Sequence, residues 1–279
     1  MLRIRRMKTG DFQSVIKLTD QEHWGYGIRD IERVRALEHR GCLVASLNGR
    51  MIGLATTITY GKRLGWIGNV VVQRKYRGSG IGSTLVQSAM GHLLCSHVKS
   101  IGLYSYPENK PMYERLGFRT EGGFVRLTMS RRTRTLVRQD RAPLRQILGL
   151  DRRVFGADRT RLLRHLFKEF PESWAWTMKR SKLTGFSVVK RYKDSSEIGP
   201  AICENQGPDE IADLLESSVA LVTKWPLEVS VPEINRAVLK VADRLGFRAE
   251  RRGVVMSLAD LDRIGTNPAI VALGFLDKG

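Results

Sequence analysis

The stretch WIGNVVVQRKYRGSGIGSTLVQSAMGHLL, residues 66 to 94, joins an apolar run, a basic glycine-rich turn and a helical pattern. Its centre, QRKYRGSGIGS at residues 73 to 83, places three glycines within five positions. Glycine is costly in ordered structure unless the backbone must turn unusually or approach another group closely. The stretch therefore predicts a strand, a ligand-binding turn and a helix in that order.

A turn of this kind aims several backbone N–H groups at one point, and the helix dipole makes that point an anion site. Glycine lets phosphate oxygens approach the backbone, and Arg74, Lys75 and Arg77 add positive charge. The spacing is not that of a G-x-x-x-x-G-K-S/T phosphate loop. Antiparallel hairpin strands ahead of the turn also exclude a dinucleotide-binding βαβ unit.

Length and composition indicate a globular chain. The 279 residues are enough for one large or two ordinary domains, and 42% apolar with 27% charged residues allows a real core. No apolar run approaches the ~18 residues of a spanning helix. The start MLRIRRMKTG lacks the apolar stretch of a signal peptide, so a cytoplasmic protein without membrane contact is predicted.

The net charge of +19 has three explanations. We rank a general basic bias first, attraction of an anionic cofactor or substrate second, and a nucleic-acid surface third. Only RRTRTLVRQDRAPLR at 131 to 145 is a dense cluster, and no aromatic-interleaved RNA motif accompanies it.

The three cysteines, Cys42, Cys95 and Cys203, lie far apart, without a CxxC motif or a paired histidine spacing. This pattern predicts neither a disulfide framework nor a metal site.

The two halves of the chain repeat one another. RLGFRTEGG at 115 to 123 returns as RLGFRAERR at 244 to 252, a shift of 129 residues. LVASLNGRMIGLATTITY, with a hairpin turn at Asn48-Gly49, corresponds to WAWTMKRSKLTGFSVVKRY, and WIGNVVV corresponds to EIGPAIC. Landmarks in the same order indicate a duplication into two similar domains.

The first half reads as an opening strand at IRRM and a helix over residues 11–24 capped by Asp11. Strands follow at about 42–47, 51–59 and 65–73, then a helix at about 81–95, a strand at 99–106 and a final strand pair around 117–130. A basic link at 131–135 joins the halves. The last residues, from Ala259 on, have no counterpart and are expected to form a helix plus an extension.

The segment from Arg77 to Gly82 resembles the R/Q-x-x-G-x-G/A loop of the GNAT acyltransferase superfamily, and the sequence from Tyr113 to Phe118, YERLGF, resembles its Y-E-K-L-G-F signature. The resemblance covers residues 1 to 130 and, more weakly, 135 to 258. It implies an α/β (α+β) protein of two tandem GNAT-like domains, each a mixed, mostly antiparallel sheet flanked by helices. Residues 1–130 would form the catalytic domain and residues 135–279 a degenerate one.

The resemblance also implies the cofactor, acetyl-coenzyme A, and the residues around it. The loop would hold the pyrophosphate, and the strand end would splay to accept the pantetheine arm and bind the thioester oxygen. The implied cofactor-binding residues are Val70, Val71, Val72, Arg77, Gly78, Ser79, Gly80, Ile81, Gly82 and Ser83.

Acyl transfer also needs an acid for the leaving thiolate and an acceptor site. By resemblance Tyr113 would be the acid, against the plain alternative of a packed aromatic side chain. The strand LGWIGNVVVQ carries no carboxylate to serve as base. An amine of pKa ~10.4 is penalised by roughly 4 kcal/mol at neutral pH, so a weakly basic acceptor is favoured. Glu22, His23 and Tyr26 are candidate acceptor contacts or relays; simple solvation is the alternative for His23.

The second half has lost these features. ENQGPDEIADLL stands where the glycine loop would be, so Asp209 and Glu210 would repel phosphate, and Ala242 replaces Tyr113. This half is expected to bind no coenzyme A and to shape the acceptor site. A polar pocket there could use Asp151, Arg152, Phe155, Asp158 and Arg159. A helix cap at Asp158 with solvated arginines is the alternative.

Taken with these patterns, the resemblance implies an acetyl-coenzyme A-dependent N-acyltransferase acting on an amine of a small molecule or peptide. Two competing functions stay open: an acyl-coenzyme A-binding regulator without turnover, and a basic nucleic-acid-associated protein. The acceptor, the acyl length and the oligomeric state are left open.

Overall fold

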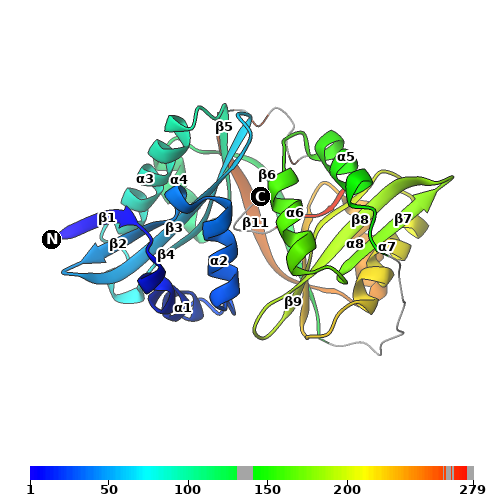
Figure 1. Cartoon of the computed structure of the whole chain (residues 1–279), viewed down its shortest axis with the longest axis horizontal. Coiled ribbons are helices and arrows are strands. Elements are labelled where there is room, and N and C mark those ends of the chain that lie inside the picture. Colours follow the sequence, from blue (N-terminus) through cyan, green and yellow to red (C-terminus); the bar gives the residue numbers. More distant parts are fainter. Residues whose placement is uncertain (131–140, 260, 262–264, 266, 275–279) are drawn as a thin grey trace. The chain divides into compact units, whose positions relative to one another are not determined.

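The computed structural model describes residues 1–130, 141–259, 261, 265 and 267–274. They divide into two compact units that do not follow a single cut in the chain (Figure 1). Unit 1 contains Met1–Glu121 together with Val255–Leu261. Unit 2 contains Gly122–Val254 together with Asp262–Phe275. Each half of the sequence therefore gives part of its last strand to the unit formed mainly by the other half.

Unit 1 is a mixed sheet with helices on both faces. Its strands follow one another in the sheet in chain order: β1 (Leu2–Arg6), β2 (Leu43–Leu47), β3 (Arg50–Tyr60), β4 (Leu64–Val72) and β5 (Ser100–Ser105). Neighbours are antiparallel except β4 and β5, which are parallel. Its helices are η1 (Thr9–Asp11), α1 (Phe12–Asp20), α2 (Ile28–Leu37), η2 (His39–Gly41), η3 (Arg74–Tyr76), α3 (Ile81–Cys95), η4 (Pro107–Asn109) and α4 (Lys110–Arg115).

Alternation along the strands assigns the helices of unit 1 to opposite faces. Leu54 and Val71 belong to the buried cluster formed with α1 and α2. Gly53, the neighbour of Leu54, faces Leu85 of α3, because a Cβ on Gly53 would lie 2.9 Å from Leu85 Cδ1. The end of β4 is thus covered by α1 and α2 on one side and by α3 on the other.

Two local predictions in unit 1 have different outcomes. The Asn48-Gly49 hairpin is confirmed: both residues have positive φ, and Leu47 pairs with Arg50. The cap at Asp11 is correct in position, since Asp11 is the N-cap residue of α1, but its carboxylate makes no capping hydrogen bond to that helix. Asp11 instead accepts hydrogen bonds from Lys8 N at 2.7 Å and from both terminal nitrogens of Arg5 at 2.7 Å.

Unit 2 repeats the mixed architecture. Its helices and strands are α5 (Leu144–Phe155), α6 (Thr160–Glu169), β7 (Trp174–Lys179), β8 (Lys182–Arg191), β9 (Ser196–Cys203), α7 (Pro208–Ala220), β10 (Leu227–Pro232), α8 (Arg236–Leu245), β11 (Arg248–Leu258) and β12 (Ile270–Ala272). The strand order is β11-β6-β10-β9-β8-β7, where β6 is Arg119–Met129, and β12 pairs with β9. In each unit the predicted mixed, mostly antiparallel sheet flanked by helices is confirmed.

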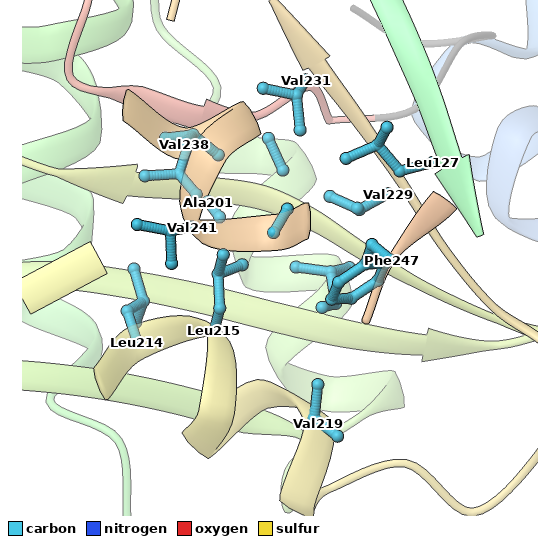
Figure 2. Packing of buried hydrophobic residues seen from close by; sticks show 14 of the residues in the cluster. Leu127, Ala201, Leu214, Leu215, Val219, Val229, Val231, Val238, Val241 and Phe247 are labelled. Carbon is cyan, nitrogen blue, oxygen red and sulfur yellow. The ribbon is translucent and has the colours of Figure 1, made fainter. Parts of the chain in front are cut away.

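The core of unit 2 lies between α7, α8 and the sheet. Figure 2 shows Leu215 of α7 and Val241 of α8 against Val229 of β10 and Leu127 of β6. Leu127 belongs to β6 (Arg119–Met129), a strand that the first half of the sequence supplies. Burial of such side chains stabilises by about 1.5–3 kcal/mol each, so the borrowed strand is an integral part of this core.

The predicted final strand pair around 117–130 is wrong, since β6 is one continuous strand. It pairs antiparallel with β10, from Leu227↔Met129 to Pro232↔Phe124. Its glycines make no turn. A Cβ on Gly123 would lie 2.2 Å from a carboxylate oxygen of Glu233, so the glycine serves a close approach.

The duplication extends to single hydrogen bonds. Phe118 N donates to Tyr113 O at 3.1 Å, and 129 residues later Phe247 N donates to Ala242 O at 3.0 Å. The extension expected after Ala259 contains strand β12 (Ile270–Ala272), whereas the helix expected there falls largely outside the described residues.

Some predictions fall outside the described residues. The boundary and basic link at 131–135 do, as does most of the basic cluster at 131–145. Within the described part of the chain, no helix is long and apolar enough to cross a membrane.

Candidate active site

The central feature of unit 1 is an irregularity at the end of β4. Leu54 pairs with Val71 and Thr56 pairs with Gly68, so two β4 residues oppose one residue of β3. This is a β-bulge at residues 69 and 70, and Asn69 has a left-handed φ of 51°. Bulges bend a strand and redirect its side chains, so the bulge changes how the following valines are presented.

The strand β4 loses its parallel neighbour at the same place. Its pairing with β5 runs from Leu64↔Ser100 to Ile67↔Leu103 and goes no further. Val70, Val71 and Val72 lie beyond the last pair. Val71 faces α1 and α2, whereas Val72 approaches Gly82 of α3, because a Cβ on Gly82 would lie 3.9 Å from Val72 Cγ2.

The glycine-rich turn leads from β4 directly into α3. Gly78 and Gly80 have φ values of 76° and 83°, a region that L side chains rarely adopt, and a Cβ on either would meet open space. Gly80 is the N-cap of α3, without a side-chain cap. The first intrahelical bond runs from Thr84 N to Gly80 O at 3.0 Å. The amides of Ile81, Gly82 and Ser83 therefore have no acceptor inside the helix.

An ion pair and hydrogen bonds connect the turn to residues 21–27, which join α1 to α2 and are called the α1–α2 segment below. Arg77 forms an ion pair with Glu22, and its Nε donates to Val72 O at 3.0 Å. Arg74 donates to Gln21 O at 2.5 Å. Glu22 was predicted as an acceptor contact and Arg77 as a phosphate contact, and the structure brings the two together. Arg77 is 46% exposed, so the pair itself stabilises little. Ser79 Oγ donates to Tyr76 O at 2.6 Å and closes the turn.

Tyr113 lies in α4 with 6% of its surface exposed. Its ring packs edge-on against Phe118, with centroids 6.0 Å apart. Burial raises the pKa of its hydroxyl well above the ordinary value, so the group is protonated throughout the neutral range. Among the described residues, no group hydrogen-bonds to this hydroxyl. Its role as an acid stays a prediction.

The predicted acceptor residues His23 and Tyr26 lie in different surroundings. His23 is exposed and has a φ of 56°. Tyr26 packs on Trp24, with centroids 5.8 Å apart, and its hydroxyl donates to Asn69 Oδ1 at 2.9 Å. Sequence reasoning missed Asn69. A polar amide inside the apolar run WIGNVVV was the available signal, because asparagine is depleted in strands.

In unit 2 acidic side chains occupy the helix start that corresponds to the glycine turn of unit 1. Helix α7 begins at Pro208 with Asp209 and Glu210 in its first turn. The Glu210 carboxylate lies over the N-cap, since a Cβ on Gly207 would be 2.2 Å from Glu210 Oε2. Ala242, the counterpart of Tyr113, is fully buried in the core.

In unit 2 the gap where β9 and β10 diverge is filled by another strand of the same protein, β12. The pairing of β10 with β9 ends at Val229↔Ile198, and β12 then pairs antiparallel with β9 at Ile270↔Ile202. Leu273 N donates to Ser230 O of β10 at 2.9 Å. The C-terminal strand thus occupies the gap that β4 and β5 leave in unit 1. This supports the expectation that the second half binds no coenzyme.

The prediction of a polar pocket in the second half is wrong, because two of its residues are buried against each other. Arg159 and Asp151 form an ion pair whose side chains are each 2% exposed, and the guanidinium stacks 3.6 Å over Phe155. Asp158 Oδ1 accepts from Thr160 N at 2.9 Å. These hydrogen bonds and the neighbouring Arg152 lower the pKa of Asp158. Asp158 thus contacts the first amide of α6, but the N-cap residue of that helix is Arg159, so the cap alternative is met only in part. Arg159 is buried rather than solvated.

Comparison with known proteins agrees with this geometry. Residues 11–118 match the Acetyltransferase (GNAT) family and residues 147–263 match the Acetyltransferase (GNAT) domain. The holothin acyltransferase of Pseudoalteromonas sp. (strain SANK 73390) is 22% identical over 248 residues, which are 85% of this chain and 81% of the relative.

Two solved structures share the fold. A putative acetyltransferase from Pyrococcus horikoshii has a TM-score of 0.82 at 20% identity, over 100% of this chain and 96% of that chain. A tandem GNAT protein from the clavulanic acid biosynthesis pathway has a TM-score of 0.63 at 12% identity, over 94% and 99%. With a duplicated sheet, a glycine turn at one helix start and two matched segments, the chain belongs to the GNAT acetyltransferase superfamily and carries two GNAT domains in tandem.

Proposed function

We propose that unit 1 transfers an acetyl group from acetyl-coenzyme A to a primary amine. The observation that carries this is the start of α3, where amides without intrahelical acceptors follow a turn with two left-handed glycines. Such a helix start binds phosphate oxygens through its N–H groups and its dipole. The pyrophosphate of the coenzyme would occupy it, contacting the backbone from Gly78 to Ser83.

The thioester would lie along the end of β4. Beyond Ile67 the strand has no pairing with β5, so the edge of residues 70–72 that faces away from β3 borders the divergence. A backbone N–H there would hold the carbonyl oxygen of the thioester. Its hydrogen bond strengthens as negative charge develops on that oxygen, which is the interaction that accelerates acyl transfer.

The chemistry needs two proton movements. The amine nitrogen attacks the thioester carbon, a C–N bond forms, and the C–S bond then breaks. Tyr113 would give its proton to the leaving sulfur and regain one from water; its raised pKa means only that the phenol carries a proton at neutral pH. The nitrogen loses its extra proton to water, since β4 carries no carboxylate. An amine of low pKa reaches the site neutral at little cost.

The acceptor side is assigned to the α1–α2 segment, with Tyr26 as its contact near β4. His23 is exposed and stays a weaker candidate. Glu22, through its ion pair with Arg77, would hold this segment against the coenzyme loop.

The test is a screen of the full chain with acetyl-coenzyme A and a panel of amines, detecting free thiol. The panel should include holothin, tyramine, spermidine, glucosamine 6-phosphate, aniline and a peptide with a free N-terminus. Thiol release with an acetylated amine of matching mass is expected. Coenzyme binding that raises the melting temperature without product would favour a regulator. Steeply salt-dependent RNA binding without coenzyme affinity would favour the nucleic-acid alternative.

A further inference from the structure

Three side chains and one carbonyl group form a continuous hydrogen-bond chain beside the bulge of β4. The Tyr26 hydroxyl donates to Asn69 Oδ1 at 2.9 Å. Asn69 Nδ2 donates to Thr56 Oγ1 at 3.0 Å. Thr56 Oγ1 donates to the carbonyl oxygen of Gly68 at 3.2 Å. The chain links the α1–α2 segment, β3 and β4 within unit 1.

The direction of this chain is set at its backbone end. A carbonyl oxygen can only accept, so the Thr56 hydroxyl proton points to Gly68. The Thr56 oxygen then accepts from the NH₂ group of Asn69, which turns Oδ1 of the amide toward Tyr26. An amide oxygen also only accepts, so the Tyr26 proton is committed to Asn69. Toward any further group the phenolic oxygen of Tyr26 therefore acts as an acceptor.

The inner members of the chain are held by burial. Thr56 is 3% exposed and Asn69 is 7% exposed. Asn69 also has the left-handed backbone of the bulge, which asparagine tolerates better than most residues. Buried hydrogen-bonded groups in series polarise one another and resist reorientation. The bulge thus sets both the position and the polarity of the Tyr26 hydroxyl.

Two carboxylates of this region, those of Glu22 and Asp30, have other partners. Glu22 pairs with Arg77. The Asp30 carboxylate accepts from Gly27 N at 2.8 Å and pairs with the buried Arg33. The group that the hydrogen-bond series presents beside β4 is therefore a neutral oxygen, that of Tyr26.

Resting on the proposed function, we infer that Asn69 is a positioning residue that fixes Tyr26 so that the phenolic oxygen accepts an N–H of the amine substrate. Holding one N–H directs the nitrogen lone pair, which lowers the entropic cost of attack. A neutral acceptor stabilises the ammonium form less than a carboxylate would, so it raises the pKa of the amine less. The substrate class is accordingly a weakly basic primary amine that enters uncharged.

The experiment compares Tyr26→Phe, Asn69→Leu and the double variant, using the amine of the panel with the highest kcat/KM. Each single variant should lower kcat/KM for the amine about fivefold, the loss of one neutral hydrogen bond of roughly 1 kcal/mol. The double variant should lose no more than either single one, because both act through the same contact. The KM for acetyl-coenzyme A should not change.

The matched control is Tyr192→Phe in unit 2, which also deletes a tyrosine hydroxyl that donates to an oxygen, here Glu197 Oε2 at 3.0 Å. It should leave the kinetics for the amine unchanged. Unchanged kcat/KM in Tyr26→Phe, or additive losses in the double variant, would overturn the inference while leaving the proposed function intact. If the unaltered protein turns over no amine, the proposed function is refuted, and with it the role of the Tyr26–Asn69 hydrogen bond in that function.

A second measurement does not depend on turnover or on the folding of Asn69→Leu. In the ligand-free protein labelled with [¹³Cζ]tyrosine, the committed Tyr26 proton should give a slowly exchanging hydroxyl resonance. Thr56→Val, which leaves the backbone of Asn69 unaltered, should speed its exchange. A Tyr26 hydroxyl proton that exchanges as fast as that of an exposed tyrosine would overturn the inference.

Discussion

Replacing Gly80 tests the proposed phosphate site at its most sensitive backbone position. Gly80 is the N-cap of α3, with a φ of 83°, and a Cβ there meets no neighbour within 4 Å. Steric fit therefore allows a side chain, and the backbone conformation limits the choice to residues that tolerate positive φ. Asparagine and aspartate both do, and they are nearly isosteric. Gly80→Asn and Gly80→Asp consequently differ mainly by one negative charge.

The magnitude follows from Coulomb's law. A unit charge about 5 Å from a phosphate oxygen, at an effective dielectric constant of about 20, costs about 3 kcal/mol. Gly80→Asp should therefore bind acetyl-coenzyme A about 100-fold more weakly than Gly80→Asn. The difference should shrink at high salt, because the turn is at the surface and exposed charges are screened.

The assay is titration calorimetry of both variants with acetyl-coenzyme A at two salt concentrations, with melting curves to check that both fold. Gly91→Ala, inside α3 and also without a neighbour within 4 Å, is the control for a change in the same helix. Its binding should match the unaltered chain. Affinities of the Asp and Asn variants within twofold of each other would show that no phosphate lies at this helix start.

Three further predictions concern other groups. Tyr113→Phe should lower kcat about 10²-fold or more while changing coenzyme affinity less than twofold, measured by rapid-mixing kinetics and calorimetry; equal turnover would remove Tyr113 from its role. Lys190 is fully buried, donates to Glu197 Oε2 at 2.8 Å, and its loss in Lys190→Met should destabilise unit 2 by about 3–5 kcal/mol, measured by urea unfolding; an unchanged midpoint would contradict this. Asp11 has a lowered pKa, first because of its hydrogen bond from Arg5, so its stabilising effect is present above the ordinary value of 3.8 and is lost as pH falls below it. Asp11→Asn should cost about 1 kcal/mol at pH 7 and flatten the acid side of the stability curve, and identical acid unfolding would refute it.

Much of the fold was predictable because its signals are local. The strand, turn and helix within residues 66–94 are found as β4 (Leu64–Val72) and α3 (Ile81–Cys95). Apolar periodicity reports which face of an element is buried, and glycine reports where the backbone needs positive φ. The duplication was readable for the same reason, because each repeat keeps its own short-range hydrogen bonds, as at Tyr113 and Ala242.

The candidate site was only partly predictable. The position of the turn and the burial of Tyr113 follow from sequence neighbours. The partners do not: Tyr26 meets Asn69 across 43 positions, and Arg77 meets Glu22 across 55. A one-residue bulge shifts the register of β4 against β3, and no residue type marks that shift unambiguously. Asn69 in an apolar run marked an unusual strand position, but nothing in the sequence named Tyr26 as its partner.

The duplication, the mixed α/β class, the turn that begins α3 and the loss of that turn in the second half could all be inferred from the amino-acid sequence. Each depends on spacing and residue type over a few positions. The three-dimensional fold was needed to find that β6 packs into unit 2, that β12 fills the strand gap there, and that Asn69 accepts a hydrogen bond from Tyr26. These depend on which distant surfaces bury one another, and many pairings satisfy the same local pattern until the whole chain is packed.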